Sequence, residues 1–293
     1  MISPYVRRRR LGIELARLRD ASKMPAETLA QRIGIGRQRL SRLENGHIIP
    51  DLEEIMRLLE TLGADQRCWT QVMDIARDAR ERGWWERWTR EMGPRQALYA
   101  NLEAGAAAIF EYHLTFLPGL MQLPEFTRFR AECDRDGLAD DFQTERAVTC
   151  RRTRQQMIQR PGGPSYEVII DELAIRRHTA SPDLVAAQLE HIVAQARPQN
   201  SLCVRVLPLA ARIGSHSVPR SAFSRYEYPD PDDPTIVTVD TVTSDLVLTE
   251  PAEVTRYRTL FDRLRDAALP PAGSLTFIEN AAESLHRQVG APQ

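Results

Sequence analysis

The sequence predicts an all-α domain of five helices followed by a mixed α/β (α+β) domain. At 293 residues, the chain exceeds one ordinary domain but is well short of three. Apolar residues recur at helical spacing up to about residue 80, whereas short runs rich in Val, Ile and Tyr, which are typical of strands, occur only later. We expect domains at residues 1–80 and 84–280 and a loose tail at 281–293.

The N-terminal helices carry local start and stop signals. In the first helix, leucines recur on one face and arginines fill the other. Gly34 breaks the second helix, and Asn45-Gly46 suits a left-handed cap at the end of the third. Asp51 opens the fourth helix with a capping-box pattern. The helices are expected at residues 5–21, 26–33, 37–44, 51–62 and 65–82.

The later part mixes helical periodicity with strand-like runs. Helices are expected at residues 97–112, 124–136, 140–159, 182–196 and 251–268, and strands at 166–170, 202–207, 224–228, 236–242 and 246–248. The segment Pro229 to Pro234 reads PDPDDP. It is expected to be a turn between two strands, because prolines withhold ladder donors and aspartates favour turns.

The charge is distributed unevenly along the chain. The first 50 residues contain eleven Lys and Arg against four Asp and Glu, a net charge of +7, whereas the remaining residues carry −8. A basic region binds nucleic acid by neutralising phosphates and releasing their counterions. Lys23 is the single lysine. The near-exclusive use of arginine indicates a high-GC coding bias and an actinobacterial source.

Residues 25–46 have the spacing of a helix-turn-helix. Ala30 is small where the second and third helices cross, and Gly34 permits the turn between them. The third helix would enter the major groove, where Arg can donate two hydrogen bonds to guanine and Gln can bond adenine. We expect base contacts from Arg37, Gln38 and Arg42, and phosphate contacts from Arg39, Ser41 and the run Arg7 to Arg10.

Two motifs in this region carry a family resemblance, LAQRIGI at residues 29–35 and RLENG at residues 42–46. Over about residues 11–63 the chain resembles the Xre family, the group related to phage Cro and repressor proteins. The resemblance implies a structural ion pair between Arg19 and Glu44. The chain departs from the family at Pro25-Ala26, where Thr-Gln is usual, and at Gly36, where Ser or Thr is usual. Ala26 cannot make the phosphate hydrogen bond of that glutamine.

A second set of short motifs follows in a specific order over about residues 82–278. The set comprises Gly83-Trp84-Trp85, Leu102-Glu103, Pro118 to Gln122, Arg151 through Arg154-Gln155, Asp171-Glu172, Gln188 to Glu190 and Val206 to Pro208. These motifs resemble the domain of unknown function that follows an Xre module in actinobacterial regulators similar to the sporulation regulator WhiJ. The resemblance implies a regulator that responds to an effector or to a small partner protein.

Some residues of these motifs are candidates for a ligand or partner site. Trp84 and Trp85 would form either core or an aromatic cage, and core is favoured because each ring buries a large area. Adjacent residues such as Asp171 and Glu172 point to opposite faces of a strand, which argues against a shared acid/base site.

Arg151, Arg154 and Gln155 fall on one helical face, since they are three and four positions apart. They could meet either Asp171-Glu172 or an anionic ligand. An internal salt bridge is favoured.

Other functional classes lack sequence support. There is no GxGxxG motif or P-loop, and the four cysteines Cys68, Cys133, Cys150 and Cys203 show no metal-site spacing. His178, His191 and His216 match no ligand pattern. No apolar run could cross a membrane, and the basic N-terminus lacks the apolar core of a signal peptide. We expect no cofactor, no metal and no enzyme activity, and a cytoplasmic, nucleoid-associated protein.

Two functional hypotheses follow. The first is a transcriptional regulator that binds double-stranded DNA as a homodimer and whose second domain senses a small-molecule effector or a small partner protein. The alternative is an antitoxin-like DNA-binding member of a two-protein system with autoregulation. A third hypothesis, an enzyme with a DNA-binding appendage, lacks a catalytic constellation in the sequence.

Overall fold

The computed structural model describes residues 2–133, 143–177, 180–197, 202–216, 218–241 and 244–289. The chain divides into two compact units. The first comprises Met1–Glu86, Tyr99–Ala106 and Tyr228–Pro234, and the second comprises Arg87–Leu98, Ala107–Glu227 and Thr235–Gln293. The predicted fold class, an all-α helix-turn-helix domain followed by a mixed α/β domain, is confirmed.

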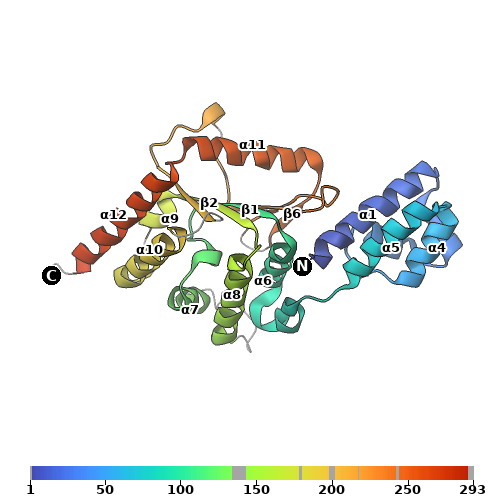
Figure 1. Cartoon of the computed structure of the whole chain (residues 1–293), viewed down its shortest axis with the longest axis horizontal. Coiled ribbons are helices and arrows are strands. Elements are labelled where there is room, and N and C mark those ends of the chain that lie inside the picture. Colours follow the sequence, from blue (N-terminus) through green and yellow to red (C-terminus); the bar gives the residue numbers. More distant parts are fainter. Residues whose placement is uncertain are drawn as a thin grey trace. The chain divides into compact units, whose positions relative to one another are not determined.

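Five helices build most of the first unit: α1 (Pro4–Ala21), α2 (Ala26–Ile33), α3 (Arg37–Glu44), α4 (Leu52–Leu62) and α5 (Gln66–Arg80) (Figure 1). Their local signals explain their bounds. Ser3 accepts a hydrogen bond from the amide of Val6 and caps α1, whereas Asp51 and Asp65 cap α4 and α5 in the same way. Gly34 and Gly63 end α2 and α4 in the left-handed conformation.

The five helices share one apolar core. Each helix turns its apolar stripe inward, which removes that surface from water and supplies the main stabilisation of so small a unit. The most deeply buried members are Leu11 and Leu15 of α1, Leu29 and Ala30 of α2, Leu40 and Leu43 of α3, Ile55, Leu58 and Leu59 of α4, and Val72, Ala76 and Ala79 of α5.

The backbone of α1 packs directly on the end of α3. A Cβ added at Gly12 would lie 2.1 Å from the carbonyl oxygen of Glu44, and one added at Gly46 would lie 2.9 Å from the backbone of Arg8. Gly46 also has a φ of 65°, which an L side chain rarely adopts. Glycine at both positions therefore allows the two helices to cross at backbone contact.

Two short stretches join the first unit from far along the sequence. Ser3 Oγ donates to Asn101 Oδ1 at 2.9 Å, and the Tyr228 hydroxyl donates to the carbonyl of Leu102 at 3.2 Å. The sequence assigns residues 99–106 and 228–234 to the second domain. In the structure, both stretches belong to the first unit instead, because they supply polar partners to α1.

The second unit is built on one six-stranded sheet with the order β3-β2-β1-β4-β5-β6. Its strands are β1 (Ala108–His113), β2 (Ser165–Asp171), β3 (Leu202–Leu207), β4 (Phe223–Glu227), β5 (Ile236–Val239) and β6 (Leu246–Leu248). The strands β1, β2 and β3 are parallel, and β4, β5 and β6 continue the sheet from β1 in antiparallel fashion.

Helices connect and cover the strands. They are α6 (Thr89–Gly105, kinked at Gly93), α7 (Pro124–Cys133), α8 (Thr144–Gln159), α9 (Glu172–Arg176), α10 (Pro182–Ala196), α11 (Pro251–Ala267) and α12 (Pro271–Val289), with short 3-10 helices at Trp84–Trp88, Gly119–Met121 and Gly214–His216. One apolar cluster joins Phe261 and Leu264 of α11 to Tyr112, Ile169 and Phe223 of the sheet. The helices α10 and α12 pack on each other and on β3.

Two sequence expectations for these elements are wrong. The helix expected at 97–112 ends at Gly105, and residues 108–113 form β1, because pairing with β2 and β4 outweighs the helical spacing of the alanines. The expected tail at 281–293 is helical up to Val289, where Leu285 is buried in the packing of α12. The expected helix ends at 134–136 and 140–142, Val242, His178 and the last four residues lie outside the described residues.

The crossing of α1 and α3 makes a first prediction. Because Gly12 meets the backbone of Glu44, we expect Gly12→Ala to lower the free energy of unfolding by about 1–3 kcal/mol. Gly36→Ala is the control, since a Cβ there meets no atom within 4 Å, and we expect it to cost below about 1 kcal/mol. Calorimetric melting of both variants checks this, and equal losses would contradict the packing argument.

Candidate nucleic-acid interface

The helices α2 and α3 form a helix-turn-helix with a short connection. Gly34 closes α2 with a φ of 75°, and the amide of Ile35 donates to the carbonyl of Ala30. No side chain caps the N-terminus of α2, which follows Pro25, or of α3, which follows Gly36. These are the two helices that a helix-turn-helix presents to DNA, and uncapped helix N-termini attract anions such as phosphate.

The solvent-facing side of α3 carries the residues predicted to read DNA. Leu40 and Leu43 face the core, so the exposed side presents Arg37, Gln38, Arg39, Ser41 and Arg42. The Arg37 side chain is 62% exposed, and its Nε lies 3.8 Å from Glu27 Oε2. A water-exposed pair at this separation is weak. The Arg37 guanidinium can therefore exchange Glu27 for a base edge at small cost.

Arg39 differs from the other arginines of α3. Its Nε donates to Glu54 Oε1 in the first turn of α4 at 2.7 Å, and this hydrogen bond raises the pKa of Arg39. Glu54 is largely buried, which strengthens its hold on the guanidinium. A phosphate contact by Arg39 must compete with this carboxylate.

The end of α3 is tied to α1 by side chains as well as by backbone packing. Arg19 Nε donates to Glu44 Oε1 at 2.7 Å, which is the ion pair that the family resemblance implies, and this bond raises the pKa of Arg19. Arg9 Nη1 donates to the carbonyl of Asn45 at 2.7 Å. Because α3 is short, these bonds to its C-terminal end orient the whole helix.

His47 follows α3 and lies near positively charged side chains at the C-terminal end of that helix. Partial burial is the largest cause of its lowered pKa, and the nearby cations of Arg9 and Arg42 add to it. The imidazole is therefore neutral at neutral pH. The two arginines beside it would attract an anionic ligand such as a phosphate group.

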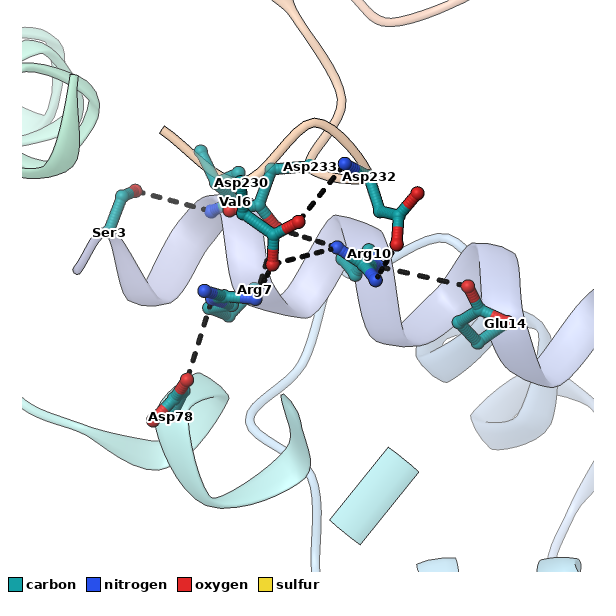
Figure 2. Close-up of polar contacts among 9 residues, drawn as sticks. All are labelled: Ser3, Val6, Arg7, Arg10, Glu14, Asp78, Asp230, Asp232 and Asp233. Carbon is teal, nitrogen blue, oxygen red and sulfur yellow. Dashed lines mark hydrogen bonds and ion pairs between the residues drawn. The ribbon is translucent and has the colours of Figure 1, made fainter. Parts of the chain in front are cut away.

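The run Arg7 to Arg10, which the sequence predicts to hold phosphates, faces carboxylates in part. Figure 2 shows Arg7 and Arg10 pointing toward Asp230, Asp232 and Asp233. Arg10 is 3% exposed. The phosphate prediction is therefore wrong for Arg10, because its guanidinium is enclosed by acidic side chains. Burial also lowers the pKa of Arg8.

The tryptophan pair of the second motif set lies in a 3-10 helix. Trp85 is buried, and its ring lies against Gly83, where an added Cβ would come within 2.2 Å of it. Trp84 is half-buried and meets Trp85 edge to face, with ring centroids 6.1 Å apart. This T-shaped pair is typical of packing between aromatic rings.

The polar residues of α8 bind the 3-10 helix at Gly119–Met121. Arg151 Nη1 donates to Gln122 Oε1 at 2.5 Å, and Gln155 Nε2 donates to the carbonyls of Gly119 and Gln122. Arg154 is buried and donates to Gln96 Oε1 at 3.4 Å. Arg151 and Gln155 thus shape the turn that the motif Pro118 to Gln122 contains.

Asp171 and Glu172 have other partners than these arginines. Asp171 accepts from the Tyr112 hydroxyl at 2.9 Å and caps α9 through the amide of Leu173. Glu172 accepts from Arg176 and from the amide of Leu209. The favoured salt bridge from Arg151 or Arg154 to this pair is wrong, because Asp171 turns toward β1 and Glu172 begins α9.

Sequence reasoning missed a buried polar group at the centre of the sheet. Glu111 of β1 accepts from the Tyr166 hydroxyl at 2.6 Å and from Ser224 Oγ at 3.3 Å, and it lies 3.0 Å from His113 Nε2. Burial raises the pKa of Glu111, but the bonds from His113 and Tyr166 outweigh this and lower it overall. The available signal was a glutamate between the apolar and aromatic residues of the segment AIFEY.

The described residues contain neither a cluster of metal ligands nor a helix that could span a membrane. Within the described ranges, no group of three or more His, Cys, Asp or Glu side chains could hold a metal ion. The helices of the same ranges include none with the length and apolarity needed to cross a membrane. The cysteines are free thiols, and burial raises the pKa of Cys150 and Cys203.

Comparison with known proteins finds two family models in the chain. Residues 10–67 match the model of a helix-turn-helix domain, and residues 96–280 match the model described as a domain of unknown function (DUF5753). No curated protein and no solved structure matches the chain. Because the second match covers more than half of the chain, the protein belongs to the DUF5753 family and carries a helix-turn-helix domain before that domain.

Proposed function

We propose that this protein is a sequence-specific, DNA-binding transcriptional regulator that reads base edges with Arg37, Gln38 and Arg42. The observation that carries the proposal is the exposed face of α3, which presents these donors on a helix whose other face is fixed in the core. The uncapped N-termini of α2 and α3 supply phosphate contacts beside it. The Xre-type motifs at 29–35 and 42–46 support the same assignment.

The second unit is proposed to sense an effector or a small partner protein, in the manner of the WhiJ-like regulators that its motifs resemble. One apolar cluster joins its sheet to α11, and the candidate residues on α8 and β2 serve internal contacts. We therefore assign the sensing role to the unit and not to those residues. Action in the cytoplasm, at the nucleoid, follows from a DNA ligand.

The reading of bases by α3 is testable by substitution. We expect Arg37→Ala or Gln38→Ala to lose discrimination at one base pair, worth about 1–3 kcal/mol, because a bidentate contact to a base edge is removed. Arg39→Ala should weaken specific and random DNA alike. Binding titrations on the operator, on single-base variants and on random DNA measure this.

Arg77→Ala is the matched control, because Arg77 is an exposed arginine of α5 outside the helix-turn-helix. Its loss should leave discrimination unchanged. Equal losses on specific and random DNA for all three α3 variants would contradict the assignment of readers.

Dimeric binding is a further expectation, because one eight-residue helix reads few base pairs. Footprinting should show two symmetry-related half-sites with centres about 10–10.5 base pairs, or a multiple of this, apart. Sedimentation of the complex should show two chains on each operator. A single half-site bound by one chain would exclude the dimer.

A further inference from the structure

The turn at residues 229–234, here called the acidic turn, forms ion pairs with two arginines of α1. Asp230 Oδ2 lies 3.2 Å from Arg7 Nη1 and 3.2 Å from Arg10 Nη1, and Asp232 Oδ2 lies 3.0 Å from Arg10 Nη2. Asp233 Oδ1 lies 3.2 Å from Arg7 Nη1 and 3.4 Å from Arg10 Nη1 (Figure 2). Each arginine is thus shared by two or more carboxylates of one turn.

The acidic turn is internally ordered. The amide of Asp232 donates to Asp230 Oδ1 at 3.1 Å, and the amide of Asp233 donates to the carbonyl of Asp230 at 3.0 Å. Prolines at 229, 231 and 234 restrict the backbone further. The turn therefore presents its carboxylates in a fixed arrangement, so that little conformational entropy is lost in the contact.

The ion pair between Asp233 of the acidic turn and Arg10 of α1 is shielded from water. The side chains of Arg10 and Asp233 are 4% and 6% exposed. Ion pairs shielded from water are screened weakly by salt, and removal of one partner leaves a buried charge without compensation. Asp78 and Glu14 add carboxylates to Arg7 and Arg10, so the acidic groups outnumber the two cations. Arg7 and Arg10 therefore each keep one carboxylate partner outside the turn, and we expect α1 to stay folded when the turn is weakened.

The segment of α1 that pairs with the acidic turn is also the segment that contacts the C-terminal end of α3. At about 100° per residue, Arg7 and Arg10 lie on one side of α1, and residues 8, 9 and 12 lie on the opposite side. On that opposite side Arg9 bonds the carbonyl of Asn45, and the backbones at 8 and 12 touch Gly46 and Glu44. The acidic turn and the end of α3 thus contact opposite faces of the same two helical turns.

The acidic turn is also covalently tied to the sheet. Glu227 is the last residue of β4, and β5 begins at Ile236, two residues after Pro234. Tyr226 and Ile236 are partners in the antiparallel ladder. Both ends of the turn are therefore continuous in the chain with paired strands.

We propose that the acidic turn regulates DNA binding by passing changes in the β4–β5 hairpin through Arg7 and Arg10 of α1 to the end of α3. This inference rests on the proposed function, since it names the regulation of the same reader helix. The bistable element is the contact of the turn with α1, which is either closed as observed or released. In the released state, the acidic turn no longer restrains residues Arg7 to Gly12 of α1. This part of α1 then fixes the orientation of α3 less firmly for DNA binding.

The first test needs no DNA and uses the full-length chain. In Asp230→Asn/Asp233→Asn, hydrogen exchange at the amides of Asn45, Gly46 and His47 should become about ten-fold faster, because their bonds close the end of α3. The control is Asp74→Asn/Asp183→Asn, which neutralises two exposed acids elsewhere. Unchanged exchange at residues 45–47 in the turn variant, with α1 folded by circular dichroism, would overturn the proposal.

The second test measures coupling. Val237 is fully buried in β5, so Val237→Ala perturbs the hairpin without touching α1. We expect it to weaken operator binding about five-fold when the turn is intact and to have no further effect in the turn variant. Equal fold-changes in the two backgrounds would contradict the proposal. Val247→Ala, a milder change on β6 opposite Thr238, serves the same purpose if Val237→Ala fails to fold.

The two tests separate the failure of this inference from that of the proposed function. If the wild-type chain binds no specific DNA, the proposed function fails, and the exchange measurement still decides whether the turn holds the end of α3. If the chain binds DNA and exchange is insensitive to the turn, only the regulatory contact is wrong.

Discussion

The backbone contact between α1 and the end of α3 is the constraint on which the first unit depends. Glycine at residue 12 brings the helix axis close enough for Glu44 to accept from Arg19 and for Arg9 to bond the carbonyl of Asn45. Isolated helices as short as α3 are only marginally stable in water, so α3 depends on its contacts with the rest of the unit. The orientation of α3 therefore depends on its contacts with α1.

This constraint changes how the basic charge of the N-terminal region is interpreted. A net charge of +7 over 50 residues suggests a uniformly DNA-facing surface. In the structure, arginines of α1 pair with Asp230, Asp233 and Glu44, and Arg39 of α3 pairs with Glu54, whereas Arg37 and Arg42 of α3 face solvent or a weakly held carboxylate. The first group fixes the shape of the unit, and the second group is available to a ligand. Charge that is buried and paired contributes little to the field that attracts phosphate.

The sequence predicted those features whose signals are local. The spacing of leucines, the cap at Asp51 and the turn at Gly34 place the first five helices within a few residues of their observed bounds. The pairing of Arg7 and Arg10 with the acidic turn was not predictable, because the turn lies more than 200 residues away and the PDPDDP segment has a sufficient local explanation as a turn. The helical spacing predicts helix up to residue 112, but strand pairing, which is non-local, overrides this weak pattern from residue 108 onward. Glu111 was missed for the same reason, since its hydrogen-bond partners come from other strands.

A structure of the full-length chain bound to its operator tests most directly the division of labour between the arginines of α1 and α3. The account predicts that Arg37, Gln38 and Arg42 lie within hydrogen-bond distance of base edges in the major groove. It also predicts that Arg7 and Arg10 keep their carboxylate partners in the acidic turn while Arg19 stays paired with Glu44. A complex in which Arg7 and Arg10 leave the turn for phosphates, or in which α3 lies outside the groove, would contradict it.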